Sequence, residues 1–325
     1  MKAFITGGTG FIGSHVIDYY LTNKPDIEIF ALVRDMKNLK RKKGANFHTL
    51  EGNLFSIPSL PSDTDYVIHL AGLTLASNLA DYYTVNQQGT ASLFQSLQQQ
   101  GIHPKRILYL SSLSAVGPSH DGTPVRESSP PHPITPYGDS KLKGEQEVQR
   151  FRNIFPVVIL RASAVFGPRD KDFIHYFRFI KKGILLSLWN PYRYISLCYV
   201  KDLVRAIDIC IQRDLKSGEI INIADPQPYR WDDIGLAAGK AMGKSLITLK
   251  IPDSVLPLFG VISRAASCFT QKPILLNPYK IKEMREKCWI ADVRKAQEKL
   301  AFSPEYSLEK AIQETTDWYI QHRWM

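Results

Sequence analysis

A tyrosine and a lysine four residues apart, Tyr137 and Lys141, are the strongest chemical pair in this sequence. Thr135 is a good N-cap and Pro136 a good first helical residue, so the pair is expected on one face of a helix, within its first turns. A phenol with the ordinary pKa of about 10 is a poor base at neutral pH. A neighbouring ammonium would stabilise the phenolate and lower that pKa, so the pair predicts proton transfer by Tyr137.

Two serines end the apolar segment that precedes this helix. In open α/β sheets, ligands bind outside the carboxyl ends of the strands. A hydroxyl at that edge can donate a hydrogen bond to a substrate carbonyl or alkoxide, so we expect Ser112 to orient a carbonyl while Tyr137 moves the proton. Ser114 is a further candidate for a substrate contact. The alternatives are a turn cap for the serines and a surface pair for Tyr137 and Lys141.

A glycine-rich loop, Thr6-Gly-Gly-Thr-Gly-Phe-Ile-Gly13, lies between the first predicted strand and the first predicted helix. Its glycines permit a tight turn, a close approach of backbone to a pyrophosphate, and packing of helix on strand. The helix N-terminus adds unpaired N–H groups and the positive end of a dipole. The loop therefore predicts binding of a nicotinamide dinucleotide, through Gly7, Thr9, Gly10, Phe11, Ile12 and Gly13.

The charge at the end of the second predicted strand bears on which dinucleotide binds. An acid there favours NAD, whereas an arginine accommodates the 2′-phosphate of NADP. Arg34 occupies the strand end, and Asp35 follows it. A guanidinium fits a phosphate bidentately, so we expect NADP(H) to be preferred, with NAD(H) as the alternative. Lys40, Arg41, Lys42 and Lys43 are interpreted as a solvated basic loop.

The elements that must position these residues alternate along the chain. Short segments that are apolar on both faces predict buried parallel strands at 2–6, 27–33, 46–50, 65–71, 106–111 and 157–161. Amphipathic segments between them predict helices at 11–21, 80–100 and 136–152. Residues 195–200, 201–212 and 220–223 are interpreted as a further βαβ piece of the same sheet. The fold class is thus α/β, a Rossmann doubly wound parallel sheet with helices on both faces.

After residue 225, frequent prolines separate short helical stretches. This pattern predicts a smaller, mostly helical C-terminal substrate domain. We expect residues 1–167 and about 195–224 to form the NAD(P)-binding domain, and residues about 168–194 and 225–325 to form the substrate-binding domain. The apolar segment 255–269 is open to three interpretations: a lid, a membrane-surface anchor, or a helix that is simply buried.

Composition excludes several classes of protein. The 325 residues carry 41 Lys+Arg and 31 Asp+Glu, a net charge of +10. Half of that surplus lies in residues 34–43, and no basic stripe with interleaved aromatics indicates nucleic-acid binding. No apolar run is long enough for stable membrane insertion. The four cysteines form no metal-spaced set, so no metal site is expected, and free thiols suit the cytoplasm.

These motifs together resemble the extended short-chain dehydrogenase/reductase family, the NAD-dependent epimerase/dehydratase family, over nearly the whole chain. The resemblance covers the glycine loop, Tyr137 with Lys141, and Ser112 five residues before Gly117. It also covers the segments 160–168, 199–203 and 292–304. It implies that Lys141 also holds ribose hydroxyls and suggests a homodimer through the helices at 80–100 and 136–152. The further cofactor contacts that it implies are Asn53, Leu54, Leu70, Ala71, Gly72 and Ala164.

Departures from the family pattern bear on the substrate. The dehydratases of the family follow the catalytic hydroxyl with Asp-Glu, but here Ser112 is followed by Leu113 and Ser114. Nucleotide-sugar enzymes often carry asparagine where this chain has Ala164, and Asn53 stands where an aspartate is usual. The basic end of the second strand looks more like the dihydroflavonol-4-reductase-like and 3β-hydroxysteroid dehydrogenase-like branch.

The sequence therefore predicts an NADP-dependent oxidoreductase that moves hydride between nicotinamide and a carbonyl/alcohol substrate, a small molecule. One alternative is a nucleotide-sugar epimerase whose NAD is reduced and reoxidised within one turnover. A second alternative is a catalytically silent NADP-binding scaffold subunit. Arg193, which precedes a predicted strand, is a candidate contact for an anionic or polar substrate.

Overall fold

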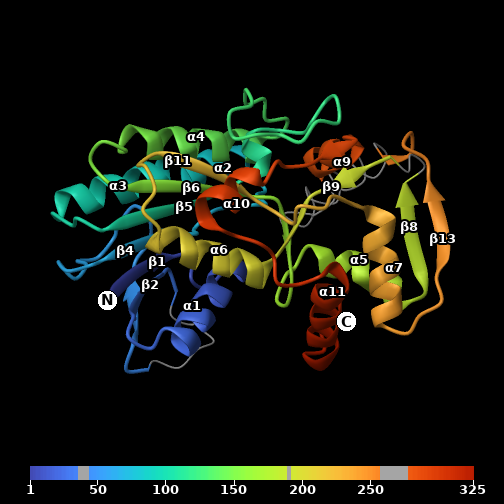
Figure 1. The fold of residues 1–325 in the computed structure, drawn as a ribbon, viewed down its shortest axis with the longest axis horizontal. Coiled ribbons are helices and arrows are strands. Elements are labelled where there is room, and N and C mark those ends of the chain that lie inside the picture. Colours follow the sequence, from blue (N-terminus) through green and yellow to red (C-terminus); the bar gives the residue numbers. More distant parts are fainter. Residues whose placement is uncertain (36–43, 189–191, 257–276) are drawn as a thin grey trace.

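A seven-stranded parallel sheet forms the centre of the computed structural model, which describes residues 1–35, 44–188, 192–256 and 277–325 (Figure 1). The strand order is β11-β6-β5-β4-β1-β2-β3, and every neighbouring pair is parallel. The strands are β1 (Lys2–Thr6), β2 (Glu28–Val33), β3 (Phe47–Glu51), β4 (Tyr66–His69), β5 (Arg106–Ser112), β6 (Val157–Ala162) and β11 (Glu219–Ile223). The order reverses between β1 and β4, and ligands of doubly wound sheets bind at that point.

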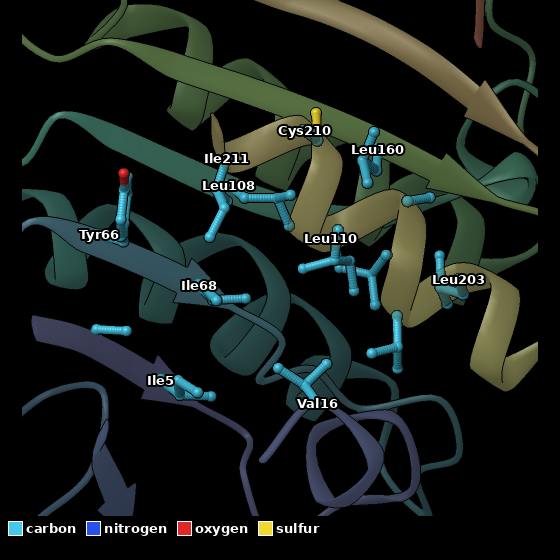
Figure 2. Packing of buried hydrophobic residues seen from close by; sticks show 14 of the residues in the cluster. Ile5, Val16, Tyr66, Ile68, Leu108, Leu110, Leu160, Leu203, Cys210 and Ile211 are labelled. Atoms are coloured by element: carbon cyan, nitrogen blue, oxygen red, sulfur yellow. The ribbon is translucent and has the colours of Figure 1, made fainter. Parts of the chain in front are cut away.

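Helices cover both faces of the sheet, as predicted. On one face α1 (Phe11–Asn23) lies beside α6 (Val200–Gln212), and on the other α3 (Gly89–Gln99) lies beside α4 (Pro136–Arg150). Each face has its own hydrophobic cluster, because the strands are apolar on both sides. Figure 2 shows the cluster under α6, where Leu203, Cys210 and Ile211 meet side chains of the central strands.

The helix predicted over 80–100 is not a single α-helix. It consists of α2 (Leu79–Tyr83), a π-helical turn over Thr84–Gln88, and α3. The Asn78 side chain accepts a hydrogen bond from the Ala80 amide and begins the first piece. Such turns are frequent at functional sites, and this one contains the buried side chain of Asn86.

The prediction that residues 195–200 add a strand to the main sheet is wrong, whereas β11 does belong to it. β9 (Tyr194–Ile195) pairs with β12 (Tyr229–Arg230) and β14 (Cys288–Trp289), and β10 (Leu197–Tyr199) pairs with β7 (Ala164–Phe166). The segment 195–200 is as apolar as the strands of the main sheet. The hydrogen-bond partners of β9 and β10 lie far away in the sequence and leave no local signal.

Most of the remaining elements lie at one end of the sheet (Figure 1). They are α5 (Phe173–Lys181), β8 (Ile184–Leu188), α7 (Trp231–Ala241), β13 (Ile247–Ile251), α9 (Pro278–Arg285) and α11 (Leu308–Gln321). Helix α10 (Arg294–Leu300) instead packs on β11 and α6 of the main sheet. Most of segment 255–269 lies outside the described residues. Across the described ranges, no helix combines the length and the apolar character that crossing a bilayer requires.

The long connection between β5 and α4 is held by the C-terminal part of the chain. The Ser119 amide donates to the carbonyl of Cys288 at 2.8 Å, and Val125 forms a bridge with Ala291. The buried Asn222 side chain donates to the carbonyls of Val125 and Asp292. One wall beside the carboxyl edge of the sheet is therefore assembled from residues more than 160 positions apart.

Candidate active site

The glycine loop between β1 and α1 has the backbone shape that close approach of a ligand requires. Gly7 has a φ of 75°, and a Cβ on it would lie 2.6 Å from the amide nitrogen of Ala71. A Cβ on Gly13 would lie 2.2 Å from the carbonyl oxygen of Gly7. Any side chain at either position would displace backbone, so both positions demand glycine.

The first turn of α1 is open to a ligand. No side chain caps this helix at Gly10, and both Thr9 and Gly10 are exposed. The backbone N–H groups of Phe11 and Ile12, in the first turn, have no carbonyl acceptor within the helix. They lie at the positive end of the helix dipole. The loop therefore fits the diphosphate of a dinucleotide.

Three further predicted cofactor contacts lie along the β2 and β3 side of this loop. Arg34 is exposed directly after β2. Asn53 is exposed after β3, and its side chain accepts a hydrogen bond from the Phe55 amide at 2.8 Å, so it shapes the turn. Leu54 is buried, and a Cβ on Gly89 of α3 would lie 2.7 Å from it. The Leu54 side chain thus packs on α3 and fixes the turn that contains Asn53.

The end of β4 brings Leu70, Ala71 and Gly72 beside the glycine loop. The Ala71 amide donates to the Thr6 hydroxyl at 3.2 Å, and that hydroxyl is joined to His69 Nδ1 at 2.6 Å. Burial lowers the pKa of His69 to about 3, so its ring is neutral. His69 is therefore part of a fixed hydrogen-bonded support and not a proton carrier.

The structure brings Ser112, Tyr137 and Lys141 together at the carboxyl end of β5. The Thr135 side chain accepts a hydrogen bond from the Gly138 amide and begins α4 there, as predicted. The Ser112 side chain lies close enough to the Tyr137 phenol to lower the pKa of that phenol. The Lys141 ammonium is buried and donates to the carbonyl of Leu110 at 2.7 Å. The end of β5 and the first turns of α4 thus bring a hydroxyl, a phenol and an ammonium to the same edge of the sheet.

The protonation of this group differs from the sequence-based expectation. Burial raises the pKa of Tyr137 to about 12, although the Ser112 side chain acts in the opposite direction. Burial also lowers the pKa of Lys141 to about 7. The expected lowering of the tyrosine pKa by the lysine is not found, because desolvation outweighs it and Lys141 is directed to Leu110.

Asn86 is a residue of this site that the sequence did not reveal. Its side chain is fully buried, accepts from the Leu73 amide at 2.7 Å and donates to Ser140 on α4 at 2.9 Å. A Cβ on Gly72 would lie 3.2 Å from Asn86 Oδ1 and 3.8 Å from Lys141 Nζ. The π-helical turn thus holds α4 against the strand end. A buried asparagine inside an apolar helix pattern was the only available signal.

A buried ion pair behind Lys141 was also missed. Glu145, one turn further along α4, pairs with Arg161 of β6 at 2.7 Å, and both side chains are 4% exposed. Ser111 donates to the same carboxylate at 2.5 Å. Glu145 also favours the charged form of Lys141, because its negative charge raises the pKa of that ammonium. The position of Glu145, four residues after Lys141 on the same helix face, is the sequence signal that could have revealed it.

The remaining predicted residues lie in two different settings. Ala164 begins β7 and is half-buried, and Ser114 is half-buried in the turn after Ser112, whose hydroxyl accepts from the Ser114 amide at 3.1 Å. Arg193 is buried, donates to Met284 and pairs with Asp253 at 2.5 Å. Its guanidinium therefore ties α9 to the chain, and the substrate contact predicted for it competes with these bonds.

Two carboxylates from outside the sheet lie near the phenol. Glu283 of α9 and Asp172, the residue before α5, both raise the pKa of Tyr137 through their negative charge. The Tyr82 ring lies 6.3 Å from the Tyr137 ring, centre to centre. The elements that face Tyr137 across the sheet edge are thus α2, α5 and α9. In the described ranges no cluster of histidine, cysteine or carboxylate side chains suits a metal ion.

Comparison with known proteins finds relatives that align with nearly the whole length of this chain. The family model described as "NAD dependent epimerase/dehydratase family" matches residues 3–224. The ceramide reductase of Caulobacter vibrioides is 24% identical, over 99% of this chain and 95% of that protein. The decarboxylating sterol-4-alpha-carboxylate 3-dehydrogenase of Candida albicans is 25% identical, over 98% of this chain and 97% of its own length.

Solved structures share the fold. The UDP-glucuronic acid 4-epimerase of Bacillus cereus with NAD superposes with a TM-score of 0.79 at 22% identity, over 99% of this chain and 100% of the other. The dTDP-glucose 4,6-dehydratase of Bacillus anthracis with NAD gives 0.77 at 17% identity, over 99% and 97%. At such identities the likeness concerns the fold. With the family match across the sheet and the glycine loop, the chain belongs to the NAD-dependent epimerase/dehydratase family and is an NAD(P)-dependent short-chain dehydrogenase/reductase.

Proposed function

We propose that this enzyme is an NADP(H)-dependent reductase or dehydrogenase that interconverts a carbonyl and an alcohol. The observation that carries the proposal is the cluster of Ser112, Tyr137 and Lys141 at the carboxyl end of β5, with a Tyr137 phenol that keeps its proton. When bound, the nicotinamide dinucleotide supplies or accepts the hydride. No carboxylate follows Ser112, so the chain lacks the acid/base pair that elimination would need.

Tyr137 is the proton donor in the direction of carbonyl reduction. With a pKa raised to about 12, the phenol is fully protonated at neutral pH and can give its proton to a developing alkoxide. Ser112 lies near the phenol, at the end of β5, and its hydroxyl is proposed to donate to the same oxygen. In the reverse direction the phenolate must form first, which the positive charge of Lys141 and of an oxidised nicotinamide would favour.

Lys141 has two functions in the proposal. Its ammonium lies on the α4 face that carries Tyr137, where it is placed to hold ribose hydroxyls. Its hydrogen bond to the carbonyl of Leu110 also fixes α4 to β5, the strand that carries Ser112.

Arg34 supports the preference for NADP(H). It is exposed at the end of β2, the position where a dinucleotide fold meets the adenosine ribose. A planar guanidinium there can bind a 2′-phosphate through two hydrogen bonds. The solved structures named above contain NAD, so the preference is a property proposed for this chain alone.

The substrate-binding residues are proposed to come from about 168–194 and 225–325. The carboxylates of Asp172 and Glu283 lie near Tyr137, and the Lys280 ammonium pairs with Glu283 at 3.0 Å. These charged groups of α9 and of the residue before α5 are proposed to contact a small-molecule substrate that carries the reacting carbonyl. A cytoplasmic homodimer that associates through α3 and α4 is part of the same proposal.

The test is a panel of ketones, aldehydes and secondary alcohols, assayed for oxidation of NADPH or reduction of NADP. Fluorescence titration with NADPH and NADH gives the cofactor preference separately. Net redox turnover with tighter NADPH binding is expected. Protein that retains NAD through purification and epimerises a sugar nucleotide without net redox would support the epimerase alternative. Binding of NADPH with no turnover across the panel would support the scaffold alternative.

A further inference from the structure

The small sheet of β8 and β13 has one face made only of isoleucine and leucine. The two strands are parallel, and directly paired residues share a face, as do alternate residues along each strand. The register places aliphatic residues opposite one another at every second position: Ile184 and Ile247, Leu186 and Leu249, Leu188 and Ile251. In Figure 1 this sheet lies at the end of the molecule remote from the seven-stranded sheet.

The two faces of this sheet differ in what covers them. Leu185 and Ser187 of β8 are buried on the face that α5 and α7 cover. On the aliphatic face, Ile247 is 72% exposed and Leu249 is 48% exposed. Within the described part of the chain, the hydrophobic clusters contain none of the six aliphatic residues. A protein that is soluble and monomeric rarely leaves such a face to water, so the face calls for an occupant.

The charge around this face indicates the chemistry of the occupant. Residues 173–188 and 234–252 carry six arginines and lysines and no aspartate or glutamate. Lys181, at the end of α5, and Lys182 and Lys244, in the turns that precede β8 and β13, are exposed. The Ile247 amide donates to the Gly183 carbonyl at 2.8 Å, which holds the two turns together. An exposed aliphatic face therefore has a cluster of lysines at its edge.

We propose that this aliphatic and basic surface docks the enzyme on a bilayer of anionic phospholipid. Ile247, Leu249 and their neighbours enter the boundary between headgroups and acyl chains, while the lysines contact lipid phosphates through long, flexible side chains. A second copy of the chain is disfavoured as the occupant, because it would bring two acid-free basic surfaces together. The surface lies outside the proton-transfer site, and its occupancy does not depend on which reaction the enzyme catalyses.

Co-sedimentation with vesicles tests the proposal. The full chain is mixed with vesicles of phosphatidylcholine alone, or of phosphatidylcholine with about one third phosphatidylglycerol. Binding is expected only to the anionic vesicles and is expected to fall as salt is raised. Each lysine near an anionic surface multiplies the membrane-binding constant by about five. The double variant Lys181→Gln/Lys182→Gln should therefore weaken binding to the vesicles by more than about tenfold.

Two matched pairs of variants separate the surface from general effects. Ile247→Ser/Leu249→Ser is compared with Ile154→Ser/Ile320→Ser, which removes two exposed isoleucines elsewhere. Lys181→Gln/Lys182→Gln is compared with Lys216→Gln/Lys299→Gln, which removes two exposed lysines elsewhere. Only the first member of each pair should lose vesicle binding. All four should keep the thermal midpoint and the NADPH binding of the unchanged protein.

Four outcomes would overturn the proposal. They are absence of wild-type binding to anionic vesicles, equal binding to neutral vesicles, and equal losses from the surface and control variants. The fourth is a change of oligomeric state in Ile247→Ser/Leu249→Ser, which would show that a second copy of the chain covers the face. The lysine variants keep the test decisive if the serine variants fold poorly.

Discussion

The Nζ of Lys141 lies 2.7 Å from the carbonyl oxygen of Leu110 and 4.2 Å from the centre of the Tyr109 ring. Both partners belong to β5, the strand that ends at Ser112. The lysine therefore fixes α4 to the strand that carries the serine. The same burial that places the ammonium so accurately disfavours its charge, which is why the pKa of Lys141 falls to about 7.

Replacement of Lys141 by methionine should stabilise the folded chain while it abolishes turnover. The folded pKa lies below the ordinary value of 10.5, so between these values the unfolded chain binds more protons. The wild-type free energy of unfolding therefore gains a contribution as pH rises from about 7 to about 10, and Lys141→Met lacks it. Near pH 7 the variant should be more stable by about 2–4 kcal/mol.

Chemical denaturation at pH values of about 7 and about 9 measures both effects. Lys143→Met, which removes a more exposed lysine from the same helix, is the control and should change stability by less than about 0.5 kcal/mol. A parallel pH dependence for wild type and Lys141→Met would contradict the interpretation of Lys141 as a poorly solvated ammonium.

Replacement of Tyr137 by phenylalanine should remove proton transfer and leave cofactor binding. General acid catalysis contributes about 10²–10⁴-fold, so kcat for carbonyl reduction should fall by about that factor. Ser112→Ala should cost about 10²-fold, because one donor to the alkoxide is lost. Tyr83→Phe removes a phenol that donates to Asp139 instead, and it should retain turnover within about threefold. Unchanged kcat in Tyr137→Phe with NADPH still bound would rule out the proposed acid.

Replacement of Arg34 by glutamine should change cofactor choice and leave the fold intact. A charged hydrogen-bonded contact to phosphate is worth about 1.5–3 kcal/mol, which corresponds to about 10–100-fold weaker NADPH binding. NADH lacks the 2′-phosphate, so its dissociation constant should change by less than about threefold. Fluorescence titration of both cofactors provides the measurement, with Arg213→Gln as the exposed control. Equal weakening for both cofactors would assign Arg34 to another role.

Replacement of Glu145 by glutamine should destabilise the chain by about 3–5 kcal/mol. Arg161 would then stay buried with an uncompensated charge, and Ser111 would lose its carboxylate acceptor. The control is Glu305→Gln, which breaks an ion pair with Arg205 at 2.6 Å at a more exposed site and should cost less than about 1 kcal/mol. Similar unfolding midpoints for the two variants would show that the buried pair contributes little.

The sequence was sufficient for the parts of the site that depend on local chemistry. The glycine loop, the N-cap at Thr135 and the Tyr137–Lys141 spacing each predict their own conformation from a few adjacent residues, and the structure has each of them where expected. The parallel sheet was also predictable, because its strands are apolar on both faces.

What the sequence could not give depends on contacts across long separations. Asn86 is recognisable only once Leu73 and Ser140 are known to lie beside it. The position of Glu283 near Tyr137 depends on where α9 lies, and the small sheets depend on partners far away in the chain. The direction of the Tyr137 pKa shift depends on burial, which spacing does not reveal.

The bridges between 119–125 and 288–292 have a consequence for synthesis of this protein on the ribosome. The nucleotide-binding loop, Ser112, Tyr137 and Lys141 all leave the exit tunnel before Cys288 is translated. Until then the backbone of Ser119 and Val125 has no strand to bond to, and Asn222 lacks the carbonyl of Asp292. The wall beside the carboxyl edge of the sheet is therefore completed only near the end of translation, after every residue of the proposed proton-transfer group has emerged.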